Sequence, residues 1–200
     1  KINKNNNKHI TYGCFNNVFK INNNVISAWS KILNKVKNSK LFLKYPAYDN
    51  YDVRSNIHQK LNKHGINDEQ IIFKGGKVPK SEFLEYYNKV DMVLDTFPHN
   101  GATTNFEAAY MGTPILTIEQ NTFMFRCGES INKNLNMDDW IAKNEKDYIL
   151  KAIKFSENKN FLENLKIKLR NVALKSFLFD SKSFSNDFYK MLINISKNSK

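Results

Sequence analysis

Apolar residues along the chain fall into two alternating patterns: short continuous runs, and stretches in which apolar positions recur every three or four residues. The short runs predict strands over residues 10–15, 41–45, 70–73, 92–94 and 115–118. The helical spacing predicts helices over residues 24–36, 53–63, 81–88 and 105–111. Such alternation implies parallel strands joined by right-handed crossovers. We therefore predict an α/β fold, a Rossmann-like parallel sheet with helices on both faces.

The pattern changes beyond residue 137, where a short edge strand at 141–142 is followed by helical spacing alone. Three carboxyl-terminal helices are predicted, over residues 147–155, 161–174 and 184–195. Their apolar positions recur at core spacing, at Phe161, Leu165, Leu169 and Phe184. The expected organisation is a flexible leader or linker at 1–8, an α/β lobe at 9–143, and helices packing on that lobe at 144–200.

Positive charge dominates the chain, with 31 Lys and Arg against 19 Asp and Glu, a net charge of +12. Only Arg54, Arg126 and Arg170 are arginines. Proteins that read phosphates and bases favour the arginine fork, so we do not expect nucleic-acid binding. The positive field would instead attract an anionic nucleotide or an acidic partner.

The sequence also bears on whether the protein spans a membrane, forms a disulfide or binds a metal. No run of eighteen apolar residues is present, so no membrane span is expected. Cys14 and Cys127 lie far apart without metal-ligand spacing; they suit a reduced, cytoplasmic setting, and a disulfide stays open. No Asp-x-Asp, Cys–His or Ser–His–Asp arrangement is visible, so no metal is expected. The sequence begins with Lys1 rather than Met, so we interpret it as a piece of a longer protein.

The most informative segment is residues 95–104, here called the phosphate turn. It follows the predicted strand 92–94 and leads through Gly101 into Thr103 and Thr104, which open a helix. The carboxyl end of a strand beside a helix amino terminus binds anions through free N–H groups and the helix dipole. Gly101, Thr103 and Thr104 are therefore candidate ligands of a nucleotide diphosphate, with Glu107 placed for ribose hydroxyls. The alternatives are threonines that cap the helix and an exposed carboxylate.

Five motifs occur in order along most of the chain. They are Phe15 to Ile21, residues 71–73 with 78–82, residues 95–98 with 100–104, residues 107–114, and residues 126–130. With this order and spacing, the stretch from about 12 to 178 resembles the carboxyl-terminal catalytic lobe of O-linked N-acetylglucosamine (O-GlcNAc) transferases, including the SPINDLY-like group.

This resemblance implies the nucleotide-sugar-binding half of a two-lobed, GT-B glycosyltransferase. Such enzymes transfer N-acetylglucosamine from UDP-GlcNAc to protein Ser or Thr, with inversion and without metal. The protein acceptor is held by a first lobe and by tetratricopeptide repeats, neither of which is visible here. We therefore expect these 200 residues alone to bind nucleotide weakly and to turn over nothing.

The resemblance also implies roles for five further residues. Lys20 would be the catalytic cation, stabilising the leaving diphosphate. Asn17 would donate to a phosphate or a sugar hydroxyl, and Lys80 would bind phosphate or ribose. Val78 would read the base through its backbone, and Phe83 would stack on it. The alternatives are solvated surface residues, and for Phe83 a helix packing on the sheet.

Departures from the family pattern leave the donor and acceptor open. Asn17 replaces the usual Gln, Phe83 replaces a His, and Ala102 replaces a polar residue. Another sugar nucleotide, such as GDP-fucose or UDP-glucose, or a glycan or lipid acceptor remains an alternative. A second alternative is a non-catalytic nucleotide-binding or basic interaction module. His99 precedes Gly101 in the phosphate turn and is not assigned as the catalytic base.

Overall fold

The molecule is built around one sheet of parallel strands. The computed structural model describes residues 9–198, so the predicted leader at 1–8 lies outside the described residues. Within this range six strands form one sheet in the order β3-β2-β1-β4-β5-β6, every pair parallel. The strands are β1 (Thr11–Cys14), β2 (Lys40–Lys44), β3 (Ile71–Lys74), β4 (Met92–Leu94), β5 (Ile115–Ile118) and β6 (Ile141–Ala142). The predicted α/β fold is confirmed.

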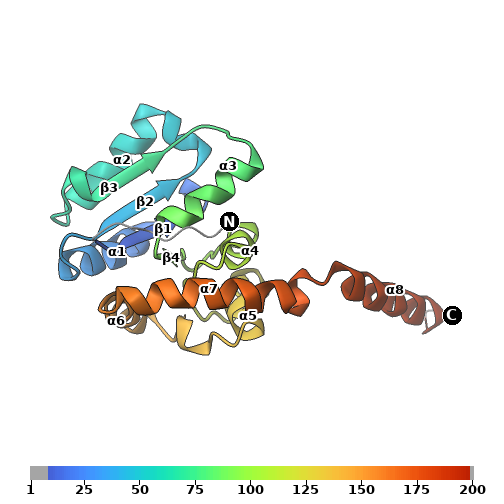
Figure 1. Cartoon of the computed structure of the whole chain (residues 1–200). Helices are drawn as coiled ribbons and strands as arrows, with labels where there is room; N and C mark the ends of the chain where they lie inside the picture. Colours follow the sequence, from blue (N-terminus) through green and yellow to red (C-terminus); the bar gives the residue numbers. More distant parts are fainter. Residues whose placement is uncertain (1–8, 199–200) are drawn as a thin grey trace.

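Helices cover both faces of this sheet (Figure 1). The α-helices are α1 (Asn23–Lys35), α2 (Tyr51–Asn62), α3 (Lys80–Glu85), α4 (Thr103–Tyr110), α5 (Cys127–Asn134), α6 (Glu145–Ser156), α7 (Lys159–Lys175) and α8 (Ser181–Asn198). Short 3-10 turns are η1 (Val18–Lys20), η2 (Pro46–Asp49), η3 (Asp68–Gln70), η4 (Tyr86–Lys89), η5 (Phe123–Phe125), η6 (Asp138–Trp140) and η7 (Phe177–Phe179). Right-handed crossovers put α1 and α2 on one face and α4 and α5 on the other. Helix α6 packs beside α1, and α7 packs beside α4.

The strand order reverses between β1 and β4, which lie side by side at the centre of the sheet. Tyr12 pairs with Met92 and Gly13 with Val93, so both strands end at the same edge. Crevices outside the carboxyl ends of strands at such a switch point are where α/β folds bind ligands. The residues after β1 and the phosphate turn after β4 therefore meet at one place.

The carboxyl-terminal helices differ in how much they bury. Helix α6 buries Tyr148, and α7 buries Leu162 and Leu169 against the lobe. Helix α8 has no buried residue and extends beyond the body of the molecule in Figure 1. Phe184, predicted at a core position, is 69% exposed. Helix α8 therefore does not pack on the described lobe, because no element among residues 9–198 covers its apolar positions.

Helix α5 was not predicted, since Ile131 is its single strongly apolar position after Cys127. Tertiary contacts hold it instead. The Asn132 side chain donates to the backbone carbonyls of Ile115 (2.8 Å) and Trp140 (3.2 Å). Gly128 packs so closely that an added Cβ would lie 2.5 Å from Thr117 Oγ1. No described helix is long and apolar enough to cross a membrane.

Candidate functional site

A buried carboxylate organises the edge of the sheet where β1 and β4 end. Asp95 follows β4 directly and is 1% exposed. Among residues 9–198 its two oxygens accept from five donors. Three donate to Oδ1 and two to Oδ2: Gly101 N (2.7 Å), Asn16 Nδ2 (2.9 Å) and Thr96 N (3.0 Å), then Asn105 Nδ2 (2.7 Å) and Thr117 Oγ1 (3.0 Å). These donors come from four segments, namely the residues after β1, the phosphate turn itself, α4 and β5, so Asp95 fixes the phosphate turn relative to the sheet.

Burial and hydrogen bonding act in opposite directions on this group. Burial raises the pKa of the Asp95 carboxyl above its ordinary value. The hydrogen bond from Gly101 N–H is the largest influence lowering that pKa, followed by the Asn105 side chain. Because donors surround both oxygens, we assign the carboxylate form to Asp95.

Helix α4 begins at Thr103 after the amino-cap residue Ala102, and no side chain caps it. The first N–H groups of a helix have no partner within the helix, so this end presents donors. The threonines do not act as caps, which was their alternative role. Thr103 is exposed, whereas the Thr104 hydroxyl donates to Asn16 Oδ1 (2.6 Å). The helix end and Thr103 therefore offer donors outward, while the Thr104 hydroxyl proton points inward.

Gly101 is needed for close packing. Its N–H is already bonded to Asp95, and an added Cβ would lie 2.6 Å from Asn105 Oδ1 and 2.8 Å from Asn16 Oδ1. The residue thus shapes the turn through the space it leaves. Its N–H contributes to the Asp95 network rather than to an outward-facing anion site.

Lys20 bridges the two strand ends. It lies at the end of η1, and its Nζ donates to the backbone carbonyl of Asn100 (2.8 Å) in the phosphate turn. Asn17 instead caps η1, accepting from Phe19 N with its Oδ1 (3.1 Å). The neighbouring Asn16 points inward and bonds to Asp95 and Thr104. The structure therefore brings Lys20 to the turn, while the Asn17 side chain caps η1.

Residues 75–79, here called the base loop, lie between β3 and α3 and carry Val78, which is half-buried. Lys44, itself buried, donates to the carbonyls of Gly75 (2.6 Å) and Gly76 (2.8 Å) and anchors the loop. Lys80 forms an ion pair with Glu107 of α4. This ion pair joins the start of α3, directly after the base loop, to α4, which follows the phosphate turn.

Phe83 is half-buried within an aromatic cluster. Its ring lies edge-on to Phe15, with ring centroids 5.9 Å apart, and to Tyr87 at 6.0 Å. This packing corresponds to the alternative stated for Phe83, a helix side chain lying on the sheet. Stacking on a base stays a prediction.

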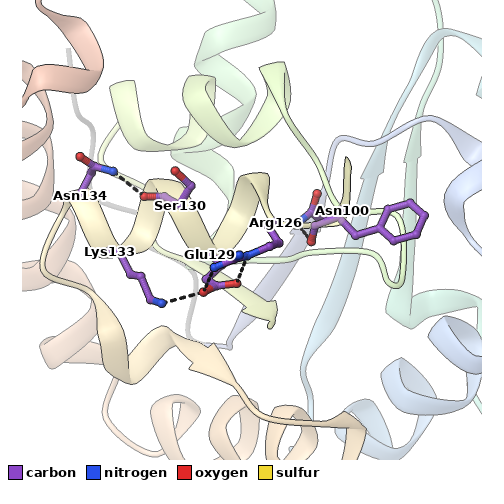
Figure 2. Close-up of polar contacts among 7 residues, drawn as sticks. Asn100, Arg126, Glu129, Ser130, Lys133 and Asn134 are labelled. Carbon is purple, nitrogen blue, oxygen red and sulfur yellow. Dashed lines mark hydrogen bonds and ion pairs between the residues drawn. The ribbon is translucent and has the colours of Figure 1, made fainter. Parts of the chain in front are cut away.

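Beside the phosphate turn, α5 carries an ion-pair group (Figure 2). Glu129 of α5 accepts from Arg126 (3.1 and 3.2 Å) and from Lys133 (2.6 Å). The hydrogen bond from Arg126 lowers the pKa of the Glu129 carboxyl below its ordinary value. Arg126 thus forms a structural ion pair with Glu129. Asn100 Nδ2 donates to the Phe125 carbonyl (2.6 Å), which ties η5 to the phosphate turn.

A cavity of about 460 Å³ opens between α5 and Phe106 of α4. It is lined by Phe123, Arg126, Cys127 and Ile131 among others, and by none of the predicted site residues. Cys127 is half-exposed and Cys14 is buried, both as free thiols. Within residues 9–198 no three His, Cys, Asp or Glu side chains are grouped to hold a metal ion.

Several residues at this edge were not singled out from the sequence. They are Asn16, Asp95, Asn105 and Thr117 of the buried network, and Tyr87, which donates to Thr104 O and to Glu107. Asp95 stood inside a quoted motif, directly after a strand. An acidic residue directly after a buried strand was the one feature of the sequence that could have indicated a role for Asp95.

Comparison with known proteins covers most of the chain. The sequence model described as glycosyl transferase family 41 matches residues 3–188. A probable UDP-N-acetylglucosamine–peptide N-acetylglucosaminyltransferase SPINDLY from Eustoma exaltatum subsp. russellianum is 32% identical over 181 residues, covering 90% of this chain and 20% of that protein. A UDP-N-acetylglucosamine–peptide N-acetylglucosaminyltransferase from Caenorhabditis elegans is 27% identical, covering 92% of this chain and 16% of its own length. The chain thus spans about a fifth of such relatives.

Solved structures agree on the fold. A mutant O-GlcNAc transferase from Thermobaculum terrenum matches with a TM-score of 0.85 at 23% identity, covering 97% of this chain and 38% of that one. WaaG, a glycosyltransferase involved in lipopolysaccharide biosynthesis, matches with a TM-score of 0.64 at 14% identity, covering 94% and 48%. The half of a GT-B glycosyltransferase predicted from the motifs is confirmed.

Proposed function

The chain belongs to glycosyltransferase family 41, and we propose that it is the donor-binding half of an inverting, metal-independent transferase of N-acetylglucosamine from UDP-GlcNAc to protein Ser or Thr. One observation carries this proposal. The uncapped start of α4 lies beside Lys20 and Glu107 at the switch point of the sheet. Relatives whose names specify this donor and a peptide acceptor support it.

The diphosphate would lie against the start of α4. Thr103 and the first N–H groups of the helix supply donors, and the helix dipole favours negative charge there. Lys20 would exchange its present acceptor, the Asn100 carbonyl, for a phosphate oxygen. Glu107 would accept from ribose hydroxyls beside Lys80, and the base would lie along the loop that carries Val78.

The reaction would be a single displacement. An acceptor hydroxyl attacks the anomeric carbon from the face opposite UDP, while the bond from that carbon to the diphosphate oxygen breaks. UDP leaves with the electron pair, and the hydroxyl proton passes to a base on the acceptor side. Lys20 and the start of α4 stabilise the charge that develops on the leaving group. No residue of this chain is assigned as that base.

The acceptor side belongs to the rest of the protein. We propose that a first lobe and tetratricopeptide repeats hold the protein acceptor, in a cytoplasmic setting that suits the free thiols.

Calorimetric titration with UDP, UDP-GlcNAc and GDP at moderate salt tests the donor assignment. The expected result is selective UDP binding that weakens in Thr103→Ala. Preference for GDP would redirect the proposal to a fucosyl-type relative. Weak binding of all three that falls uniformly with salt would indicate a basic interaction module instead.

A further inference from the structure

The hydroxyl of Tyr87 lies between two parts of the candidate site. Tyr87 belongs to η4 and is fully buried. Its OH is 2.9 Å from the Thr104 carbonyl in the first turn of α4 and 3.1 Å from Glu107 Oε2. One proton is thus shared between the start of the helix and the carboxylate one turn further along. A hydroxyl placed in this way holds both groups at a set separation.

Packing and hydrogen bonds hold the Tyr87 ring and backbone in place. The ring stacks on Phe15, with centroids 3.9 Å apart and planes at 22°. The Tyr87 carbonyl accepts from Thr113 Oγ1 and from Lys166 Nζ, both at 3.1 Å. The hydroxyl therefore stands on a support that is already ordered before any ligand arrives.

Glu107 is held at both oxygens. Its side chain is 11% exposed, with Oε2 on Tyr87 and Oε1 paired with Lys80 of the base-loop side. The terminal torsion of a Glu side chain is broad when nothing constrains it. Because each oxygen has its own partner, rotation of the carboxylate about its terminal torsion is restricted, and each oxygen keeps a lone pair for a ribose hydroxyl.

We propose that Tyr87 is a positioning residue that aims Glu107 at the ribose, and so sets a preference for ribonucleotides over 2′-deoxyribonucleotides. The inference rests on the proposed function, since Glu107 meets a ribose only there. A carboxylate aimed at two neighbouring hydroxyls is left partly unpaired when one hydroxyl is missing. Such a site rejects the deoxy analogue more strongly than a loosely held carboxylate does.

The test compares the affinities of the chain for UDP and 2′-deoxy-UDP. A hydrogen bond to a charged group predicts that wild type prefers UDP by about tenfold. Tyr87→Phe, which keeps the stacked ring and removes only the hydroxyl, is expected to bring this ratio close to one. Tyr86→Phe is the matched control, because the Tyr86 OH donates to the exposed Glu82 (3.1 Å), and its ratio should equal that of wild type.

A ratio is insensitive to a general loss of affinity, which a merely structural role would produce. Glu107→Asp moves the carboxylate away from Tyr87 and from the ribose together, so it should lower the ratio as well. A ratio unchanged in Glu107→Asp overturns the inference even if Tyr87→Phe does not fold. A ribose preference retained in folded Tyr87→Phe also overturns the inference and leaves the proposed function standing. A wild-type chain that binds both nucleotides equally overturns the inference alone, whereas one that binds neither overturns the proposed function as well.

Discussion

Asp95 accepts a hydrogen bond from the backbone N–H of Gly101, six positions further along the chain, with 2.7 Å between Oδ1 and N. This bond closes the phosphate turn onto the end of β4. The same carboxylate holds Asn16 from the end of β1 and Thr117 from β5. The start of α4 is therefore positioned by a buried anion.

Asp95→Asn is predicted to destabilise the fold. The substitution replaces one carboxylate oxygen by an NH₂ group that faces donors, so buried donors such as Asn105 Nδ2 lose their acceptor. The expected loss is about 3 kcal/mol in the free energy of unfolding, measured by urea denaturation. Asp187→Asn on exposed α8 is the control and should change stability by less than about 0.5 kcal/mol. Equal stability of the two variants would contradict the assigned role.

Lys166 is predicted to make stability rise at alkaline pH. Burial lowers the pKa of this lysine from 10.5 to about 8, while its Nζ donates to the carbonyls of Tyr87 and Val90. A neutral amine still has two N–H donors, so both bonds survive deprotonation. Between pH 8 and 10.5 the folded state has lost a proton that the unfolded state retains. Stability therefore rises with pH through this window, by up to about 3 kcal/mol.

Urea denaturation between pH 7 and 10.5 measures this rise. Lys166→Met should lack the contribution, whereas Lys168→Met, an exposed neighbour on α7, should keep it. If the pH profiles of the two variants coincide, the pKa of Lys166 is not the cause.

Local pattern was sufficient for the strands that flank the site. The predicted bounds 92–94, 115–118 and 141–142 coincide with β4, β5 and β6, because short apolar runs there end abruptly at polar or turn residues. Helix α5 was missed because its stability comes from Asn132 and Gly128 contacting other elements. Phe184 was misplaced because periodicity identifies an apolar stripe without saying what covers it.

The site residues likewise divide into those that local sequence predicted and those that only tertiary packing determines. Sequence order placed Lys20 and Thr103 at two strand ends, and parallel topology brought those ends together. The network around Asp95 was beyond reach, since Asn16 and Asp95 are 79 residues apart in the sequence. The sequence offered two adjacent amides, and Asn17 was predicted as the polar contact. In the structure Asn16 is the amide that points inward to Thr104, while Asn17 caps η1. Packing alone decides which of the two points inward.

Ala102→Asp is predicted to weaken binding of UDP. Ala102 is the exposed amino-cap residue of α4, so a carboxylate there stands where the diphosphate charge would lie. Repulsion between like charges near a protein surface should lower UDP affinity by about tenfold or more relative to Ala102→Asn, the neutral variant of similar size. Calorimetry at low and high salt measures the difference, which should shrink as salt screens the charges. Equal affinities at low salt would place the diphosphate elsewhere.

Lys20→Met is predicted to slow turnover of the full-length enzyme far more than it weakens donor binding. The ammonium faces the phosphate turn through the Asn100 carbonyl, and its charge counts most when the leaving diphosphate becomes more negative in the transition state. Removing one such donor should lower kcat by about a hundredfold or more, with a smaller change in KM for the nucleotide sugar. Lys35→Met, the same change at the exposed end of α1, should leave kcat unaltered. A kcat for Lys20→Met within twofold of wild type would remove Lys20 from the reaction and assign stabilisation of the leaving group to the start of α4.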